Sequence, residues 1–486
     1  MPGTVRVIVK DEVNVKLENI EVQDRRALVK MFSYEIPGAR YLPAVRLGRW
    51  DGKASYFNLG GTTYVNLLDK ILPYLYDKNY DIELEDIRDY TTNFTFTEIT
   101  EESFSDRVWP TGHPAAGQPV VLRDYQVEIV NNFLKNPQCL QEVATGAGKT
   151  LITAALSLSV EGMGRSIVVV PNKDLVKQTE ADYRNLGLDV GVYFGDRKEW
   201  GKTHTICTWQ SLNVLLKNTK DGEGDVTIGE FVEGVVCIII DEAHQAKADA
   251  LKELLTGVMS TVPIRWGLTG TIPKEQYAAQ ALFCTIGPVI HRLSARELQE
   301  QGVLSQCHVN VIQLQDNSEF TNYQSELKFL LENKPRMDKL AEMIRAIALE
   351  GNTLVLVDRI NAGQELVSRI PDSVFINGDV KSDKRKEEYD EVATSANKII
   401  VATYGVAAVG LNIPRIFNLV MIEPGKSFVR VIQSIGRGVR KAEDKDFVQI
   451  WDITSSCKFS KRHLTKRKEF YREAAYPFTI EKIVYQ

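Results

Sequence analysis

The stretch Val143-Ala144-Thr145-Gly146-Ala147-Gly148-Lys149-Thr150 decides the fold of this chain. It follows a short apolar run and precedes residues 151–156, which are good helix formers, so the sequence predicts a strand, a loop and a helix in that order. We interpret the stretch as a phosphate-binding loop. Val143 stands where the general pattern has its first glycine, and a Gly-rich turn before an ordinary helix is the alternative.

Four residues of this loop carry the predicted chemistry. Gly146 and Gly148 have no side chains, so backbone N–H groups can close around phosphate oxygens. Lys149 can reach the β- and γ-phosphates, and the Thr150 hydroxyl can ligate Mg²⁺. The loop therefore predicts a nucleoside triphosphate as ligand.

Composition limits the class of protein. At 486 residues the chain should hold roughly three domains. The content of hydrophobic residues, 44%, is ordinary. No apolar run is long enough to span a bilayer, and the sequence does not open with an apolar signal core. We therefore expect a cytoplasmic protein with no membrane partner. The six scattered cysteines read as reduced core residues. A net charge of −5 means that any nucleic-acid contact must come from local patches.

Residues 1–110 differ from the rest. Residues 5–10 and 13–17 alternate like half-buried strands and residues 67–77 resemble a helix, which predicts a small α+β domain. Between them, basic and aromatic residues interleave: Arg40, Tyr41, Arg46, Arg49, Trp50, Lys53 and Tyr56. This mixture suits phosphate contacts and base stacking, and the alternative is a loop whose aromatic side chains pack inward. Residues 89–117 look like a linker.

Strand and helix signals alternate after this segment. Leu122-Arg123-Asp124-Tyr125-Gln126 opens an amphipathic helix, and the Gln126 amide offers both a donor and an acceptor to an adenine edge. Ligands of open parallel sheets bind beyond the carboxyl ends of the strands. Residues that fall at such ends, or are simply polar loop starters, are Pro171, Asn172, Thr208 and Gln210.

A second anchor is Val235-Val236-Cys237-Ile238-Ile239-Ile240-Asp241-Glu242-Ala243-His244. Two carboxylates at the end of a buried strand are costly unless a cation or a reaction requires them. Asp241 can hold Mg²⁺ and Glu242 can polarise the attacking water. His244, with Thr269 and Thr271 at the end of the next strand, could report which nucleotide is bound.

From about residue 302 the alternation restarts without a second phosphate loop. Strands end at Asp358-Arg359 and at Thr403, and Gly410-Leu411-Asn412-Ile413-Pro414 follows. A helix then places Gln433, Arg437 and Arg440 on one side, where arginines can address a γ-phosphate presented by a neighbouring domain. The basic stretch 458–472 reads as a solvated helix or a phosphate contact, and we favour the solvated helix.

In this order the motifs resemble those of superfamily 2 helicases over about residues 118–455, and Arg49-Trp50-Asp51-Gly52-Lys53 ahead of them is similar to the UvsW-type phage helicases of recombination and fork rescue. The resemblance implies an α/β fold of two tandem RecA-like parallel-sheet domains, 111–305 and 306–486, after the α+β domain 1–110. It implies ATP between the two domains, a nucleic-acid strand across them and a monomer.

The resemblance also implies roles residue by residue. Catalysis would involve Lys149, Asp241, Glu242, Arg437 and Arg440, and Thr150 and Asp241 would hold the metal. The nucleotide would be bound by Arg123, Gln126, Thr145, Gly146, Ala147, Gly148, Lys149, Thr150 and Gly410. Nucleic acid would contact Arg49, Trp50, Lys53, Pro171, Asn172, Thr208, Gln210, Asp358, Arg359 and Thr403. Coupling would fall to His244, Thr269, Thr271 and Gln433. Asn412 replaces the aspartate of many members.

We therefore expect an ATP- and Mg²⁺-dependent translocase that remodels branched double-stranded and single-stranded DNA in recombination, repair and replication. An RNA helicase is the alternative that the core motifs leave open. An ATP-dependent clamp that binds DNA without unwinding it is a further one, against which Glu242, Arg437 and Arg440 argue. A nuclease subunit of restriction type is a less favoured alternative, because the sequence shows no separate acidic cluster of the kind that such nucleases use.

Overall fold

The computed structural model describes residues 3–89, 94–109, 116–243, 248–378, 388, 391–392, 394–406, 415–425, 447–474 and 476–485. The chain divides into two compact units, each of which is described by itself. The first comprises Met1–Val143 and Gly148–Arg292, and the second comprises Ala144–Ala147 and Leu293–Gln486.

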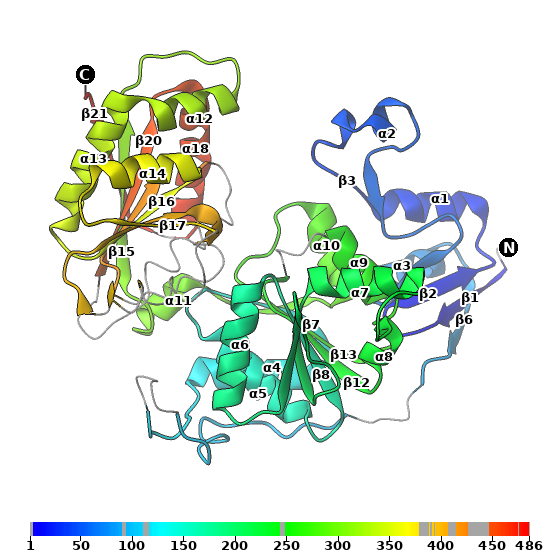
Figure 1. The fold of residues 1–486 in the computed structure, drawn as a ribbon. Helices are drawn as coiled ribbons and strands as arrows, with labels where there is room; N and C mark the ends of the chain where they lie inside the picture. Colours follow the sequence, from blue (N-terminus) through cyan, green and yellow to red (C-terminus); the bar gives the residue numbers. More distant parts are fainter. Residues whose placement is uncertain are drawn as a thin grey trace. The chain divides into compact units, whose positions relative to one another are not determined.

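A four-stranded sheet opens the first unit (Figure 1). Its order is β5 (Thr62–Tyr64), β2 (Asn14–Glu18), β1 (Thr4–Val9) and β6 (Asp81–Asp86). β1 runs antiparallel to β2 and parallel to β6. The predicted alternation holds because every second residue of β1 and β2 is buried. The helices are α1 (Val22–Met31), the short η2 (Val65–Leu67) and α3 (Leu68–Asp77), which confirms the helix predicted to close at Asp77.

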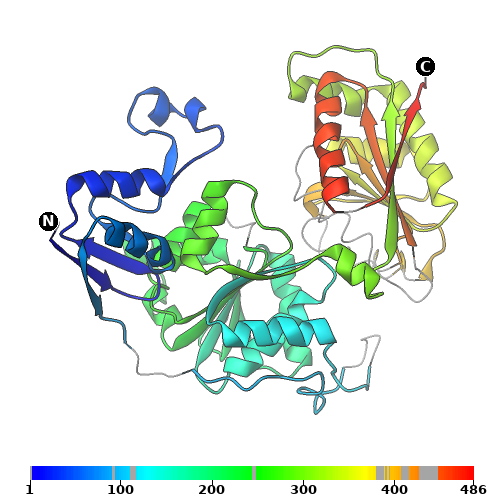
Figure 2. The same ribbon diagram turned by 180° about the vertical axis from the view of Figure 1, so that it is seen from behind.

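An arm leaves this small domain between α1 and β5. It consists of β3 (Ser33–Glu35), η1 (Ala39–Tyr41), α2 (Pro43–Arg46) and β4 (Lys53–Ser55), and β3 pairs antiparallel with β4. Both views show the arm standing away from the four-stranded sheet (Figures 1 and 2). Gly52 has a φ of 77° and a Cβ there would lie 3.2 Å from Ala39 Cβ, so the turn needs glycine.

The rest of the first unit surrounds an eight-stranded sheet, ordered β10-β9-β11-β8-β12-β13-β7-β14. Its strands are β7 (Gln138–Val143), β8 (Arg165–Val170), β9 (Val190–Phe194), β10 (Arg197–Lys198), β11 (His204–Thr208), β12 (Val235–Ile240), β13 (Ile264–Thr269) and β14 (Val289–Leu293). Strands β9, β11, β8, β12, β13 and β7 are parallel to one another, so their carboxyl ends share one edge.

Helices cover this sheet in two groups. The first group is α4 (Asp124–Lys135), α5 (Lys149–Val160) and α6 (Lys173–Asn185), which contact one another in turn. The second is α7 (Trp209–Asp221), α8 (Ile228–Val232), α9 (Ala248–Thr256) and α10 (Gln276–Thr285), which share one apolar cluster with β12. Strands buried on both faces explain the uninterrupted apolar run of β12.

The described part of the segment predicted as a linker, residues 94–109, contains no helix or strand but packs against the sheet domain. Ile99 exchanges two hydrogen bonds with the Asn131 side chain of α4, at 2.8 and 2.9 Å. The ring of Phe96 lies 6.0 Å from that of Trp266. These contacts and the half-buried ring of Phe96 tie the segment to the surface of the sheet domain.

The second unit contains a seven-stranded sheet in which all neighbouring strands are parallel. In order its strands are β17 (Val374–Ile376), β18 (Ile399–Thr403), β16 (Thr353–Val357), β19 (Asn418–Ile422), β20 (Phe447–Ser455), β15 (Gln306–Leu314) and β21 (Phe478–Ile483). Its helices include α11 (Ala295–Glu300), α12 (Tyr323–Glu332), α13 (Lys334–Ala348), α14 (Ile360–Arg369) and α18 (Lys458–Glu473).

Helix α18 corrects one interpretation of the basic tail. It lies along the sheet (Figure 2) and buries Leu464, Phe470 and Tyr471. Arg467, counted among the solvated charges, is buried and makes two 2.8 Å hydrogen bonds to the Asp452 carboxylate. The helical spacing of the apolar residues was the available signal, and the density of positive charge obscured it.

The fold class is confirmed: two parallel-sheet domains follow a small α+β domain. All six cysteines are buried and unpaired, as predicted. Among the described residues, no helix is long and apolar enough to cross a membrane.

Candidate active site

The predicted phosphate loop joins β7 to α5. Gly148 is the N-terminal cap of α5 with a φ of 78°, and Gly146 has a φ of 96°. Both values lie in the left-handed region that favours glycine, so the two glycines allow the turn. Lys149 and Thr150 form the first turn of the helix, where free N–H groups and the helix dipole favour an anion.

Gln126 lies against this loop. A Cβ on Gly148 would come within 2.7 Å of Gln126 Nε2, so the missing side chain makes room for the amide. Gln126 is buried, and its Oε1 accepts a 3.0 Å hydrogen bond from the backbone N–H of Arg123 in a capping box. The structure therefore brings Arg123, Gln126 and the loop together, as the adenine-recognition hypothesis requires.

The centre of the site is an ion pair between the two anchors of the sequence. Lys149 Nζ lies 2.5 Å from Glu242 Oε1, and only 9% and 14% of the two side chains are exposed. The Lys149 ammonium, which would bind phosphate when a nucleotide is present, is paired here with the predicted catalytic carboxylate. Glu242 has a φ of 50°, which is a strained conformation for a residue other than glycine.

Asp241 is the second carboxylate of the site. It is buried at the carboxyl end of β12, and burial raises its pKa to about 6, while the charge of Lys149 opposes this rise and that of Glu242 adds to it. A divalent cation beside Asp241 would stabilise the charged form that burial disfavours. Asp241 and the half-buried Thr150 thus fit a magnesium site whose other ligands are phosphate and water.

No cluster of three or more His, Cys, Asp or Glu side chains that could hold a metal occurs among the described residues.

The contact between the Asp-Glu segment and the next strand involves a residue that the sequence did not single out. The backbone N–H of Gly270 donates to Glu242 Oε2 at 3.3 Å. The Thr269 hydroxyl donates to the Thr271 carbonyl at 2.7 Å, and both threonines are buried. Thr269 and Thr271 shape the turn that presents this amide, and their coupling role stays a prediction. No side-chain signal marks a backbone donor, which is why sequence reasoning missed it.

The strand-end residues of the first unit lie together at the carboxyl edge of the sheet. Asn172 Oδ1 accepts a 2.9 Å hydrogen bond from Leu175 N–H, and the Thr208 hydroxyl accepts one of 3.2 Å from Ser211 N–H, so both cap helices. Gln210 Nε2 donates to the Pro171 carbonyl at 3.2 Å. Each polar side chain thus has a local structural task, and contact with nucleic acid stays a prediction.

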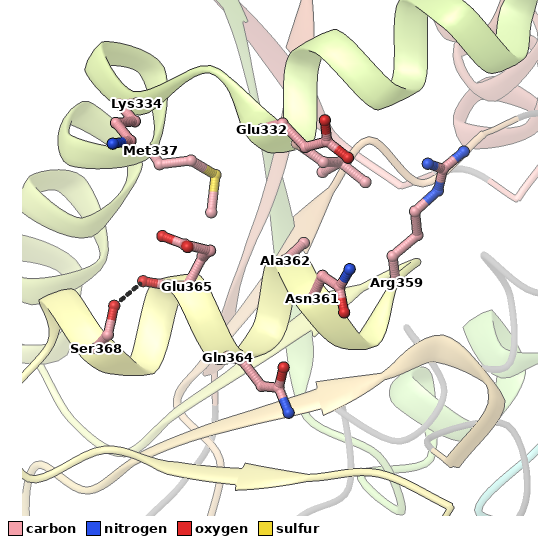
Figure 3. Close-up of a pocket in the computed structure, with 10 residues that line it drawn as sticks. Glu332, Lys334, Met337, Arg359, Asn361, Ala362, Gln364, Glu365 and Ser368 are labelled. Carbon is pink, nitrogen blue, oxygen red and sulfur yellow. Dashed lines mark hydrogen bonds between the residues drawn. The ribbon is translucent and has the colours of Figure 1, made fainter.

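In the second unit, Arg359 precedes α14 and donates a 3.0 Å hydrogen bond to Gln324 Oε1. It also lines a pocket of about 400 Å³ between α13 and α14 (Figure 3). The pocket combines buried Met337 and Ala362 with charged groups such as Lys334 and Glu365. Asp358 and Thr403 are not among its lining residues, so the structure does not gather the three predicted nucleic-acid residues around it.

Five predicted site residues lie outside the described residues: His244, Gly410, Gln433, Arg437 and Arg440. Asn412 does too. Their roles stay predictions from the resemblance.

The arm carries the remaining nucleic-acid candidates. Arg49 and Lys53 are exposed, as are Arg40 and Arg46 nearby. Trp50 is half-buried and its indole N–H donates to the Lys53 carbonyl at 3.0 Å. Tyr56 is 3% exposed and belongs to the core, as the alternative of a loop with inward-facing aromatics predicts for this residue. The arm therefore presents these four cations together with the exposed ring of Tyr41.

Comparison with known proteins agrees with this geometry. The family profile described as "Type III restriction enzyme, res subunit" matches residues 119–274, and that of the "Helicase conserved C-terminal domain" matches residues 335–442. The ATP-dependent DNA helicase uvsW of Enterobacteria phage T4 is 22% identical over 461 residues, covering 90% of this chain and 88% of that protein. The DNA 3'-5' translocase XPB2 of Sulfurisphaera tokodaii is 24% identical, covering 60% of this chain and 62% of that protein.

A solved structure shares the fold. The ATP-dependent Type ISP restriction-modification enzyme LlaBIII bound to DNA superposes with a TM-score of 0.57 at 17% identity, covering 82% of this chain and 33% of that one. The two parallel sheets of this chain are therefore RecA-like domains.

A phosphate loop, an Asp-Glu pair at the neighbouring strand end and a second parallel-sheet domain together define a nucleotide-hydrolysing motor, and the chain is a superfamily 2 helicase. Within that superfamily it is similar to the UvsW helicase of phage T4 over most of the length of both chains.

Proposed function

We propose that this chain hydrolyses ATP to move along DNA and to remodel branched DNA such as forks and junctions. The single observation that carries the proposal is the Lys149–Glu242 ion pair, because it joins the phosphate loop to the predicted catalytic carboxylate. The relatives named as DNA helicase and DNA translocase support DNA as the substrate.

The chemistry follows from the competition for Lys149. When the β- and γ-phosphates of ATP reach the loop, they attract the Lys149 ammonium and release Glu242 from its ion pair. Glu242 Oε1 can then accept a hydrogen bond from water and orient it toward the γ-phosphorus. Bound Mg²⁺, held by Thr150 and Asp241, would neutralise charge on the phosphate oxygens. Gln126, which is set against Gly148, is placed to read the adenine edge.

Choice of a branch is assigned to the arm. A motor that holds one strand through its phosphates does not by itself distinguish a fork from a linear end. Arg46, Arg49 and Lys53 are exposed on the arm and can take phosphates beside a junction. A phage helicase with this task would work in the cytoplasm of the host cell.

The test measures ATP hydrolysis and strand separation on linear, forked and four-way DNA beside matched RNA. We expect DNA to stimulate hydrolysis more than RNA and branched DNA to be unwound preferentially. Stimulation by RNA alone would favour the alternative of an RNA helicase, and tight DNA binding without strand separation would favour the clamp.

A double variant tests the arm. Arg49→Ala with Lys53→Ala should weaken binding of forked DNA and flatten its salt dependence, because each phosphate contact contributes a slope of about −0.9 to log K against log salt. Hydrolysis stimulated by single strands should hardly change. The matched control is Arg26→Ala with Lys30→Ala, which removes the same charge from the exposed face of α1. Equal losses of affinity for forked DNA in the two double variants would show that the arm contributes only through the overall charge of the domain.

A further inference from the structure

We propose that helix α10 is the positioning element that fixes the arm relative to the ATP site, and that the contacts of Tyr34 and Tyr56 with this helix determine the preference for branched DNA. This inference rests on the proposed function, since it assumes that the arm contacts the branch.

Helix α10 has two buried faces, and they belong to different cores. Leu282 lies in the core of the sheet domain together with Leu254 and Leu255 of α9. Ala281 and Cys284 lie in the core of the N-terminal domain, among the side chains of its sheet and helices. A helix shared by two cores cannot shift relative to either domain without repacking side chains. The two domains therefore move as one body, in agreement with their place in a single compact unit.

The face toward the N-terminal domain forms a stripe at helical spacing. Tyr277, Gln280, Ala281 and Cys284 recur at intervals of three, one and three residues, which places them on one side of the helix. Both Tyr277 and Gln280 accept a hydrogen bond from a tyrosine of the N-terminal domain. The stripe thus combines apolar packing with directional contacts.

Those directional contacts hold the base of the arm. Tyr34 in β3 donates from its hydroxyl to Gln280 Oε1 at 3.2 Å. Tyr56, directly after β4, donates to the Tyr277 carbonyl at 2.5 Å. The two rings lie 6.0 Å apart, edge to face. Both strands of the arm are therefore fastened to α10 where the arm leaves the domain, while α2, which carries Arg46, lies beyond this point (Figure 1).

The same helix follows the ATP site closely in the chain. Gly270, whose N–H donates to Glu242, precedes the first residue of α10, Gln276, by six positions. A second connection lies at the end of α9, where the Thr256 carbonyl accepts a 2.8 Å hydrogen bond from Asn14 Nδ2. These contacts hold the arm in a fixed orientation relative to the strand ends that carry the chemistry, which a flexible linker would not do.

The test compares a double variant of the fastening contacts with a control variant on the same helix. Tyr56→Phe with Gln280→Ala removes both fastening hydrogen bonds, and phenylalanine keeps the aromatic ring in the core. Gln276→Ala is the control, because Gln276 is exposed on the same helix. Binding of forked DNA by the double variant should weaken about fivefold to tenfold, as expected for one or two lost hydrogen bonds. ATP hydrolysis stimulated by single-stranded DNA should stay within about twofold.

Hydrogen exchange reads the docking itself, independently of DNA. In the double variant the amides of residues 33–35 and 53–57 should exchange faster, and in the control they should not. Faster exchange with an undiminished preference for forks would overturn the positioning role. Unchanged exchange would overturn the claim that these contacts hold the arm. A wild-type chain that binds forked and single-stranded DNA equally would instead refute the proposed function, and this role with it.

Discussion

Two glutamates in the two units invite comparison. Glu242 follows β12 and Glu423 follows β19, and each of these is a buried parallel strand in the interior of its sheet. Both adopt the left-handed region that is uncommon outside glycine, with φ values of 50° and 42°. By local backbone and by place in the sheet they are near equivalents, yet only Glu242 lies beside a phosphate loop.

The partners of the two carboxylates differ. The Glu423 carboxylate accepts hydrogen bonds of 2.7 Å from Arg336, 3.1 Å from Ser460 and 3.2 Å from Thr454. These three donors are themselves buried in the second unit. Burial raises the pKa of Glu423, and the charge of Arg336 opposes that rise. Glu242 instead pairs with Lys149, whose ammonium has a competing ligand in the phosphates of ATP. The difference is between a carboxylate with permanent partners and one whose partner is exchangeable.

The largest expected effect comes from the same substitution at both positions. Glu242→Gln should still bind ATP but hydrolyse it about 10²–10⁵-fold more slowly, because the water loses its carboxylate. Glu423→Gln should lower the free energy of unfolding by roughly 3 kcal/mol, because Arg336 loses a buried charge partner. Steady-state hydrolysis and urea denaturation, measured on both variants, give the two readouts.

The comparison fails if the readouts do not separate. Near wild-type turnover in Glu242→Gln would show that this carboxylate does not position the water. Slow turnover in a fully folded Glu423→Gln chain would show that the second glutamate is also part of the chemistry.

The next effect concerns Asp241 and pH. Since its pKa is raised to about 6 from the ordinary value near 3.8, the folded chain holds this proton more tightly than the unfolded chain. Stability due to this group is therefore present at low pH and is lost as pH rises through about 6. Asp241→Asn removes this cost, and the nucleotide-free variant should be up to about 3 kcal/mol more stable than wild type at pH 8, and less so at pH 5.

Denaturant titrations at the two pH values measure this difference, and Asp182→Asn is an informative control. Burial also raises the pKa of Asp182 to about 6, so the same pH dependence is expected there, but Asp182 lies on α6 and is not a predicted metal ligand. Saturating Mg²⁺ and nucleotide should shrink the advantage of Asp241→Asn alone. An equal response of both variants to ligand would remove Asp241 from the metal site.

The two halves of the predicted ATP site could be located from the sequence because the motifs are carried by side chains in a fixed order. The loop, Asp241 and Glu242 form a strand-loop-helix and a strand end, and parallel pairing brings the two together. Strand β12 was predicted with the observed bounds because six apolar residues between a glycine and a carboxylate admit few alternatives.

What could not be predicted depends on tertiary contacts. The local sequence leaves open whether Tyr56 is exposed or packs inward, and the hydrogen bond to Tyr277, far along the chain, decides it. Arg467 reads as solvated until Asp452 is placed beside it. The Gly270 amide has no side-chain signature at all. In each case one residue's environment is set by another whose proximity the local pattern does not encode.

The smallest effect separates a structural partner from a ligand contact at Asn172. Its Oδ1 caps α6 by accepting from Leu175 N–H, and it was also predicted to contact nucleic acid. Asn172→Ala should cost about 1 kcal/mol of stability through the lost cap, whereas Asn172→Ser should keep the cap and most of that stability. If the side chain serves only the helix, hydrolysis stimulated by single strands should follow stability and be normal in Asn172→Ser. If the amide also contacts the strand, both variants should need more single-stranded DNA for half-maximal stimulation, because serine lacks the amide donor. Normal stimulation in both would leave Asn172 a cap, with permanent partners like those of Glu423.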